Sequence, residues 1–402
     1  MLAFTNARVI DGTGKPPINN ATVIVGNKKI EAVGTGLSIP DEATVINIKG
    51  RTLLPAFSDA HTHLGGSDLL TRPALGGRDL TYDYALNSSA ALDWGVLTVR
   101  SAGDFMPDIV TYRDDVSAKQ LRAPRILAAG RMILASGGHP LDTVFGSSEV
   151  IRDNACVVCD ESTDIDAEVK ALADAGVDWI KTFLSTINKM NYPHPVPRLE
   201  HKTLKKITEA AHKYGKPVML HVENPADIEE AVELGFDSIE HLIGVGNTFF
   251  DVSDALLYKL AGGNVYVVPT LASVKAHDGM LSGAEPVYPH LEKAVKRMAD
   301  AGVKLGVGCD SGIPFVPYGE CVHTEMELLV SLGLKPMDAI CAATGGNSKL
   351  FRLDGVLGTI EAGMLADMVV LNADPLEDVR NTRQIGLVIK EGRIVVDNIL
   401  SS

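Results

Sequence analysis

The chain repeats a pattern of a helix, a glycine and a short apolar strand, and this pattern limits the folds that it can adopt. In residues 165–180, apolar side chains follow helical spacing up to the stop at Gly176, and an apolar strand comes next. Glycine just past the last helical turn is a common helix end. Strands of this kind are expected at 96–99, 177–180, 218–220, 236–239, 265–268 and 303–307, with 125–134 as a further candidate.

Together with a strand that opens at Pro55, these segments make eight short apolar strands that alternate with helices. Such alternation predicts a parallel sheet that is covered by helices. Eight units favour an α/β fold of the closed (β/α)8 TIM-barrel type. An open doubly wound sheet is the alternative, but no Gly-X-Gly-X-X-Gly motif follows an early strand.

The two ends of the chain have a different pattern, which indicates antiparallel β structure. Strands are expected at 21–25 and 29–33 around the hairpin signal Gly26-Asn27, and again at 367–371, 386–390 and 393–396. Neither end has enough strands to bury a face alone. We therefore expect residues 1–55 and 356–402 to form one small composite β-sandwich domain, with residues 56–355 forming the barrel.

Side chains that can bind metal ions stand where the expected barrel strands end. His61 and His63 are two positions apart, so both side chains point to one face of a strand. His221, His241 and Asp310 end later strands, and they would meet the first pair on one rim of a barrel. Four histidines with oxygen donors predict a centre with two divalent ions, for which zinc is the expected metal.

Lys181 is expected to end the fourth strand and to lie on the same rim. One interpretation is a structural lysine in a salt bridge, since an ammonium group is costly to bury and has no lone pair for a metal. Among four histidines that bind metals, however, a cation would be repelled. Carboxylation of the amine by carbon dioxide would give an anionic carbamate, which can bridge two metal ions.

These residues resemble the amidohydrolase superfamily, specifically its binuclear members with a carboxylated lysine on the fourth strand. The resemblance covers essentially the whole chain. Besides the ligands, it is carried by the segments 55–63, 95–100, 136–139, 306–311 and 357–367. The nearest subgroup resembles prolidase-like and imidazolonepropionase-like hydrolases, including Xaa-Arg and Xaa-Lys dipeptidases. Two departures are Ala56, where glycine is usual, and Glu223, where dipeptidases of the group tend to carry tyrosine or histidine.

The resemblance implies a metal-dependent hydrolase that cleaves a carbon–nitrogen bond in a small amide, dipeptide or cyclic amide. A hydroxide would bridge the two ions, because metal binding lowers the pKa of water to about 7. Asp310 would take the hydroxide proton and pass it to the leaving nitrogen. His139 would bind a substrate carboxylate or the oxyanion, or else pack its loop. Arg100 would hold a ligand or buttress the carbamate.

Other functions are compatible with the same pattern: a deaminase, a lactone or phosphoester hydrolase, and a non-catalytic scaffold. Deaminases of the superfamily usually use one metal, lack the lysine ligand, and place a glutamate three residues after the histidine of the fifth strand. Glu223 lies only two residues after His221. It is either a solvated carboxylate near a helix that starts at Pro225, or a charge that favours a neutral or cationic substrate group.

Composition restricts the partners that we expect. The net charge of -14 argues against nucleic acid, and no apolar run is long enough to span a membrane. The N-terminus shows no signal peptide, and the five scattered cysteines suit a reducing cytoplasm. Cys156 and Cys159 lack a second pair that would complete a zinc site. We expect a cytoplasmic protein with a small-molecule substrate, assembled as a homo-oligomer.

Overall fold

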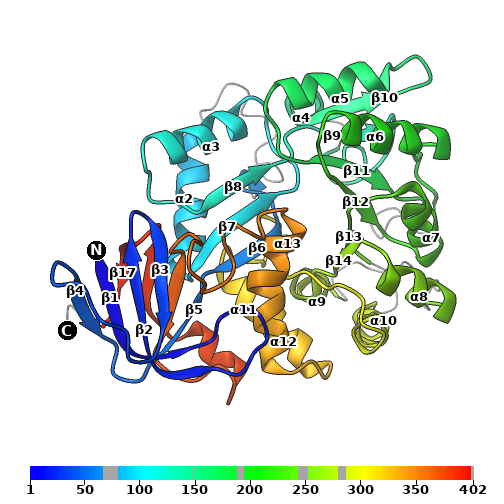
Figure 1. Ribbon diagram of the computed structural model, residues 1–402. Coiled ribbons are helices and arrows are strands. Elements are labelled where there is room, and N and C mark those ends of the chain that lie inside the picture. The colour runs from blue at the N-terminus through cyan, green and yellow to red at the C-terminus, as the bar shows by residue number, and fades with distance from the viewer. Residues whose placement is uncertain (67–79, 147, 188–193, 243–251, 279–286, 400–402) are drawn as a thin grey trace.

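A computed structural model describes residues 1–66, 80–146, 148–187, 194–242, 252–278 and 287–399, and it confirms a mixed α/β fold (Figure 1). Strands from both ends of the chain form one eight-stranded sheet in the order β17-β16-β15-β5-β1-β2-β3, with β4 paired to β1. These strands are β1 (Leu2–Val9), β2 (Ile18–Gly26), β3 (Lys29–Gly34), β4 (Thr44–Asn47), β5 (Thr52–Pro55), β15 (Met368–Leu371), β16 (Ile385–Lys390) and β17 (Arg393–Asp397).

The expected hairpin at Gly26-Asn27 is confirmed, and its turn explains why these residues form it. β2 and β3 are antiparallel, and Gly26 pairs with Lys29. The two residues between them, Asn27 and Lys28, have φ angles of 49° and 69°. Two successive positive φ angles define the type I′ turn, whose twist matches that of the flanking strands.

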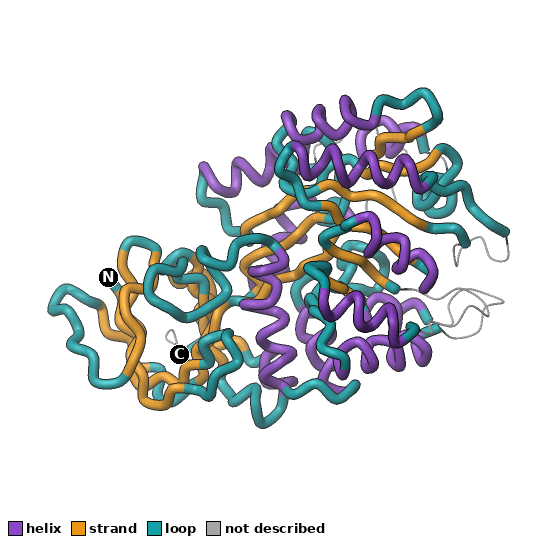
Figure 2. The backbone as a smooth tube through the Cα atoms, turned by 45° about the vertical axis from the view of Figure 1, so that its right-hand side comes forward, coloured by secondary structure: helices purple, strands orange, loops and turns teal. Residues whose placement is uncertain are grey.

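The central strands of this sheet are buried on both faces. In β15, Met368 and Val370 belong to an apolar cluster made by the sheet itself, whereas Val369 and Leu371 belong to the main core of the molecule. Because side chains alternate along a strand, one face of the sheet covers its own core and the other covers the helical part. In Figure 2 the strands of this sheet curl back on themselves at the end of the molecule where both termini lie. The sandwich expected from the sequence is therefore built from one continuous curled sheet.

The remaining strands form two parallel sheets, which lie between helices (Figure 2). The order in the first is β6-β7-β8, and in the second β10-β9-β11-β12-β13-β14. Their bounds are β6 (Phe57–Thr62), β7 (Val96–Ser101), β8 (Arg125–Ala128), β9 (Met132–Ala135), β10 (Cys156–Cys159), β11 (Ile180–Leu184), β12 (Val218–Val222), β13 (Ser238–His241) and β14 (Tyr266–Val268).

Helices separate most of these strands in the chain. None of the helices in the described ranges has the length and apolar character needed to cross a bilayer. The helices are α2 (Thr81–Asp93), α3 (Asp108–Ala118), α4 (Glu149–Ala155), α5 (Ile165–Asp174), α6 (His201–Lys213), α7 (Pro225–Leu234), α8 (Asp254–Gly262), α9 (Leu271–His277), α10 (Tyr288–Asp300), α11 (Glu320–Ser331), α12 (Pro336–Cys341), the π-helix η1 (Ala342–Gly346), α13 (Asn347–Leu350) and the 3-10 helix η2 (Val379–Arg383).

Backbone hydrogen bonds connect both edges of the three-stranded sheet to the six-stranded sheet or to segments beside it. On one side, the amide of Asp178 donates to the carbonyl of Ala128 at the end of β8 over 2.7 Å. On the other side, Gly306 donates to Val267 of β14, and Ala60 of β6 donates to Val307, each over 2.9 Å. The segment around Val307 therefore lies between β14 and β6.

Three of the expected strands differ from the sequence prediction: 125–134, 303–307 and 177–180, the last of which is replaced by β11 at Ile180–Leu184. The segment 125–134 is divided into β8 and β9, because Gly130 has a φ of 65° that ends the extended backbone. The segment 303–307 contributes only an isolated bridge between Leu305 and Val267. A Cβ atom on Gly308 would lie 2.6 Å from Val268 and 2.7 Å from the backbone of His61. This close approach requires glycine, which weakens regular strand structure.

Candidate metal centre

The structure brings the predicted histidines together with Asp310. His61 lies in β6, His63 follows that strand, His221 lies in β12, and His241 ends β13. Ring centroids are 4.5 Å apart for His61 and His241, 4.6 Å for His221 and His241, and 5.5 Å for His61 and His63. Residues from four parts of the chain thus converge on one small volume.

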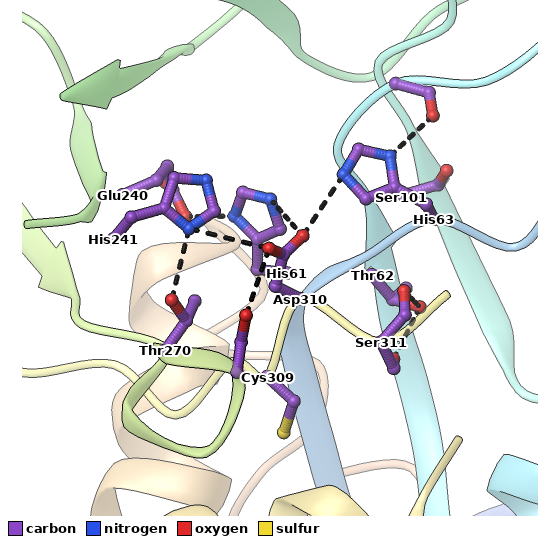
Figure 3. A network of polar contacts seen from close by, with 12 residues as sticks. His61, Thr62, His63, Ser101, Glu240, His241, Thr270, Cys309, Asp310 and Ser311 are labelled. Atoms are coloured by element: carbon purple, nitrogen blue, oxygen red, sulfur yellow. Dashed lines mark hydrogen bonds and ion pairs between the residues drawn. The ribbon is translucent and has the colours of Figure 1, made fainter. Parts of the chain in front are cut away.

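Asp310 lies at the centre of this group, as Figure 3 shows. Its Oδ1 atom is 3.3 Å from Nε2 of His63 and 3.5 Å from Nε2 of His61. Its Oδ2 atom is 3.8 Å from Nδ1 of His241 and 3.4 Å from the hydroxyl of Ser273. Two ligands of one tetrahedral zinc ion, with bonds of about 2.0–2.2 Å, lie roughly 3.3 Å apart. The distances from Asp310 to His61 and His63 therefore fit side chains that bind the same metal ion.

Hydrogen bonds to the other ring atoms fix how His61 and His63 face Asp310. Nδ1 of His61 is 2.7 Å from Glu240 Oε2, and Nδ1 of His63 is 2.8 Å from the carbonyl of Gly103. Such partners set the ring orientation and keep Nε2 available for a metal. For His241, Nδ1 lies 3.1 Å from the hydroxyl of Thr270 (Figure 3).

Glu240 is an important part of this arrangement that the sequence prediction did not identify. Strand alternation sends neighbouring side chains to opposite faces, so His241 alone was expected on this rim. His241 has a φ of 76°, which ends the extended backbone and lets both side chains reach His61. The sequence signal that could have identified Glu240 is its position directly before His241, because carboxylates often orient the histidines of a metal site.

Arg100 is fully buried and forms a charged hydrogen bond with Glu240. Its guanidinium donates to Glu240 Oε1 over 2.8 Å, to the hydroxyl of Ser238 over 2.9 Å and to the carbonyl of Ala60 over 2.6 Å. Burial by itself would raise the pKa of Glu240, but the charge of Arg100 and the bond from His61 lower it to about 2. Arg100 therefore supports Glu240 and, through it, the ring of His61, and none of these three bonds goes to Lys181.

Lys181 is the second residue of β11, so the expectation that it ends the fourth strand is wrong. The apolar run continues through Thr182, Phe183 and Leu184, all of which are buried. Lys181 is also buried, and its Nζ atom has no hydrogen-bond partner among the described residues. Burial lowers the pKa of this amine to about 8.

The donor set fits divalent cations. Besides Nζ of Lys181, the buried Nε2 atoms of His61 and His221 also lack a hydrogen-bond partner in the described structure. An unsatisfied buried polar atom costs about 1–3 kcal/mol. A cation would satisfy the imidazole nitrogens, and a carbamate on Lys181 would supply further oxygen ligands. Buried imidazole nitrogens without a hydrogen-bond partner, one of them 3.5 Å from a carboxylate oxygen, are the expected arrangement of a metal-binding site.

A second group consists of His139, His221 and Glu223, whose potential ligand atoms lie within 4.8 Å of one another. The rings of His139 and His221 are 4.6 Å apart, and Nδ1 of His139 bonds the hydroxyl of Thr143 over 2.7 Å. Glu223 is 1% exposed and accepts a hydrogen bond from Ser185. The interpretation of Glu223 as a solvated carboxylate is therefore wrong.

Several residues of this region have backbone angles that side chains other than glycine rarely adopt. The φ angles are 76° at His241, 64° at Leu242, 46° at Thr270 and 60° at Asp310. Each such residue costs on the order of 1–3 kcal/mol and persists only where its surroundings hold it. The chain therefore stores local strain where the candidate ligands converge.

Known proteins resemble this chain in sequence and in fold. The amidohydrolase family model matches residues 52–395. An ochratoxinase from Aspergillus niger is 24% identical over 92% of this chain and 81% of its own length. An imidazolonepropionase from Symbiobacterium thermophilum is 26% identical over 98% of this chain and 92% of its own. The crystal structure of a proposed prolidase from Bifidobacterium longum has a TM-score of 0.82 and 28% identity, covering 98% of this chain and 94% of that chain.

These similarities confirm the resemblance to prolidase-like and imidazolonepropionase-like hydrolases, and with it the prediction of an enzyme that hydrolyses carbon–nitrogen bonds. The family match begins in β5 and ends in β17, so it includes every candidate ligand described above. The chain belongs to the amidohydrolase family.

Proposed function

We propose that this protein is a hydrolase with two divalent metal ions, expected to be zinc, that cleaves an amide, dipeptide or cyclic amide bond of a small molecule. His61, His63, His221, His241, Asp310 and a carbamate on Lys181 would hold the ions. The observation that supports this most is the approach of the Nε2 atoms of His61 and His63 to Asp310 Oδ1, at 3.5 Å and 3.3 Å.

When bound, the ions would lower the pKa of a water molecule to about 7 and polarise the scissile carbonyl. The residues of the chain supply the proton transfers. Asp310 accepts the proton of the attacking water and donates it to the leaving nitrogen, which otherwise would depart as an unstable anion. Its contacts with His61 and His63 hold the carboxylate at the reaction centre. Arg100 and Glu240 keep the ring of His61 in place.

His139 and Glu223 would lie on the substrate side of His221. A hydrogen bond between Nδ1 of His139 and the hydroxyl of Thr143 fixes the ring of His139, which would stabilise the oxyanion or bind a substrate carboxylate. The negative charge of Glu223 would favour a substrate that is neutral or cationic near the scissile bond. A charged hydrogen bond of this kind contributes about 1.5–3 kcal/mol, or roughly tenfold to a hundredfold in kcat/KM.

The scaffold that supports this proposal is a closed (β/α)8 barrel. The backbone bonds from Asp178 to Ala128, and from Ala60 to Val307, support closure of the two parallel sheets into a ring. In such barrels, active sites are built at the carboxyl ends of the strands, where His221 and His241 lie.

The five free cysteines support the proposal of a reducing compartment, expected to be the cytoplasm. A homo-oligomer is a further proposal, which light scattering would test.

A substrate screen tests the proposed function. Zinc-loaded protein would be incubated with a library of dipeptides, N-acyl amino acids and cyclic amides, and products would be identified by mass spectrometry. We expect an amine and a carboxylic acid from at least one compound class, with loss of turnover after removal of the metals. Release of ammonia alone would identify a deaminase instead, and activity confined to lactones or phosphoesters would also refute the proposal.

A further inference from the structure

We infer that Asp104 is a positioning residue of the metal centre, whose carboxylate clamps the backbone directly after His63 and so holds this ligand toward Asp310. The inference rests on the proposed metal-dependent function. His63 follows β6 and Asp104 follows β7, and these two strands are parallel neighbours. The loops at their carboxyl ends therefore lie side by side on the edge of the sheet where the candidate ligands converge.

The carboxylate of Asp104 accepts hydrogen bonds from the two amides that come next after His63. The amide of Leu64 donates to Oδ2 over 3.0 Å, and the amide of Gly65 donates to Oδ1 over 2.9 Å. The hydroxyl of Ser101 also donates to Oδ2. Hydrogen bonds to an ionised acceptor are about twice as strong as those between neutral groups. These bonds fix the direction in which the chain leaves His63.

The residue before Asp104 completes a reciprocal contact between the two loops. Nδ1 of His63 donates to the carbonyl of Gly103 over 2.8 Å, so one loop orients the ring while Asp104 holds the backbone of the other. The amide of Asp104 donates to the carbonyl of Gly130 over 3.0 Å, which anchors the clamp. A shift of Asp104 would therefore move Nε2 of His63 away from Asp310, which lies 3.3 Å from it (Figure 3).

The packing around Asp104 makes both of its oxygens necessary. Asp104 is fully buried. A Cβ atom on Gly65 would lie 2.6 Å from Oδ1, so a larger residue at this position would push the carboxylate away. Asparagine has nearly the same shape as aspartate, but it has one acceptor oxygen and its NH₂ group would face an N–H donor. Asp104→Asn therefore removes one side of the clamp with little change in volume.

A metal titration tests this assignment independently of turnover. Metal-free wild-type protein and the variants Asp104→Asn and Asp104→Ala would be titrated with Co²⁺, following the visible absorption of the bound ion. Bound metal would be counted by mass spectrometry after gel filtration. The matched control is Asp114→Asn, which changes an exposed aspartate of α3, the helix that follows Asp104. Circular dichroism and urea unfolding of the metal-free proteins would measure the folded fraction of each variant.

These measurements separate positioning from a role in the fold alone. A residue that only supports the fold would change the unfolding free energy of the metal-free protein, whereas the folded molecules would bind Co²⁺ as before. We expect the ion held by His63 to bind more weakly in Asp104→Asn and weaker still in Asp104→Ala. The loss should approach the roughly 10–100-fold that removal of an outer hydrogen-bond partner causes. The absorption bands should shift as well, because the ring of His63 would no longer be held in one direction.

The wild type and Asp114→Asn should bind Co²⁺ alike. Wild-type affinity and absorption in folded Asp104→Ala would overturn the inference. If that variant does not fold, the same result in Asp104→Asn would overturn it equally. Failure of the wild type to bind metal at all would refute the proposed function and this inference together, so the two failures can be told apart.

Discussion

Glu240 determines how His61 presents its ring, because it accepts hydrogen bonds from both His61 and Arg100. In Glu240→Gln, the guanidinium of Arg100 would stay buried without its counter-charge. Loss of one partner of such a buried pair costs about 3–5 kcal/mol of unfolding free energy. Weaker orientation of His61 should also lower metal affinity by roughly 10–100-fold. Urea unfolding and a metal titration would measure the two effects.

The control for this prediction is Glu233→Gln. Glu233 pairs with Lys259 over 3.4 Å, and both side chains are largely exposed. An exposed pair contributes about 0–1 kcal/mol, so this variant should unfold like the wild type. Equal stability and equal metal affinity of Glu240→Gln and Glu233→Gln would show that Glu240 does not support the site.

The role of Lys181 can be tested at the same scale. Lys181→Ala should lose the bridge between the ions, and with it bound metal and most of the activity. In wild-type protein prepared with ¹³C-bicarbonate, a carbamate carbon should appear in the NMR spectrum and be absent from the variant. Lys206→Ala, which changes an exposed lysine of α6, is the control. Full activity of Lys181→Ala would contradict the two-metal proposal.

At the scale of elements, α11 holds the start of α9 through a single buried carboxylate. Glu325 accepts hydrogen bonds from the amides of Leu271 over 2.9 Å and Ala272 over 2.7 Å. These are orphan donors of the first turn of α9, which has no side-chain cap of its own. The preceding residue, Thr270, bonds His241, so this contact also anchors the edge of the metal centre.

This carboxylate makes stability depend on pH. Burial raises the pKa of Glu325 from 4.5 to about 8. Between these two values the folded state binds more protons at this group than the unfolded state, so the unfolding free energy decreases as pH rises. The contribution is fully present below pH 4.5 and is lost as pH approaches about 8. Glu325→Gln, which cannot ionise, should lack this component.

Urea unfolding of the wild type and of Glu325→Gln between pH 5 and pH 9 would measure this pH-dependent part of the unfolding free energy. The difference in unfolding free energy between Glu325→Gln and the wild type should shift in favour of the variant as pH rises to about 8, and then become constant. A difference that is the same at every pH would mean that Glu325 ionises alike in the folded and unfolded chain.

The sequence predicts elements best where local chemistry decides them. The Gly26-Asn27 hairpin and the glycine after α7 follow from backbone preferences, and both are present. At Gly130, where 125–134 divides, a Cβ atom would lie 2.7 Å from Met106 and 3.0 Å from Val177, and no local pattern reveals this close packing. Lys181 was placed at a strand end because a charge was taken as the limit of an apolar run. The contact of Glu240 with Arg100 joins residues 140 positions apart, so the local pattern does not reveal it.

At the scale of the whole molecule, we propose that residues 1–55 and 356–402 form one domain and that residues 56–355 form the barrel. β15 supports this division, because it pairs with β5 on one side and with β16 on the other. Its side chains alternate between the core of the curled sheet and the main core of the molecule. The two ends of the chain therefore stabilise each other and cover the same side of that main core.

A truncated chain that ends at Glu361 would lack β15, β16 and β17, and it tests this division. Leu53 and Leu54 of β5 are fully buried, and each belongs to a different core. Loss of β15 would expose both of them together with the unpaired edge of β5, and exposed apolar edges lead to aggregation. We expect insoluble protein on expression, whereas a chain that ends at Ile399, which keeps all three strands, should stay in solution with full metal content. A soluble and active protein ending at Glu361 would show that the barrel folds without the C-terminal strands, and the proposed composite domain would then be wrong.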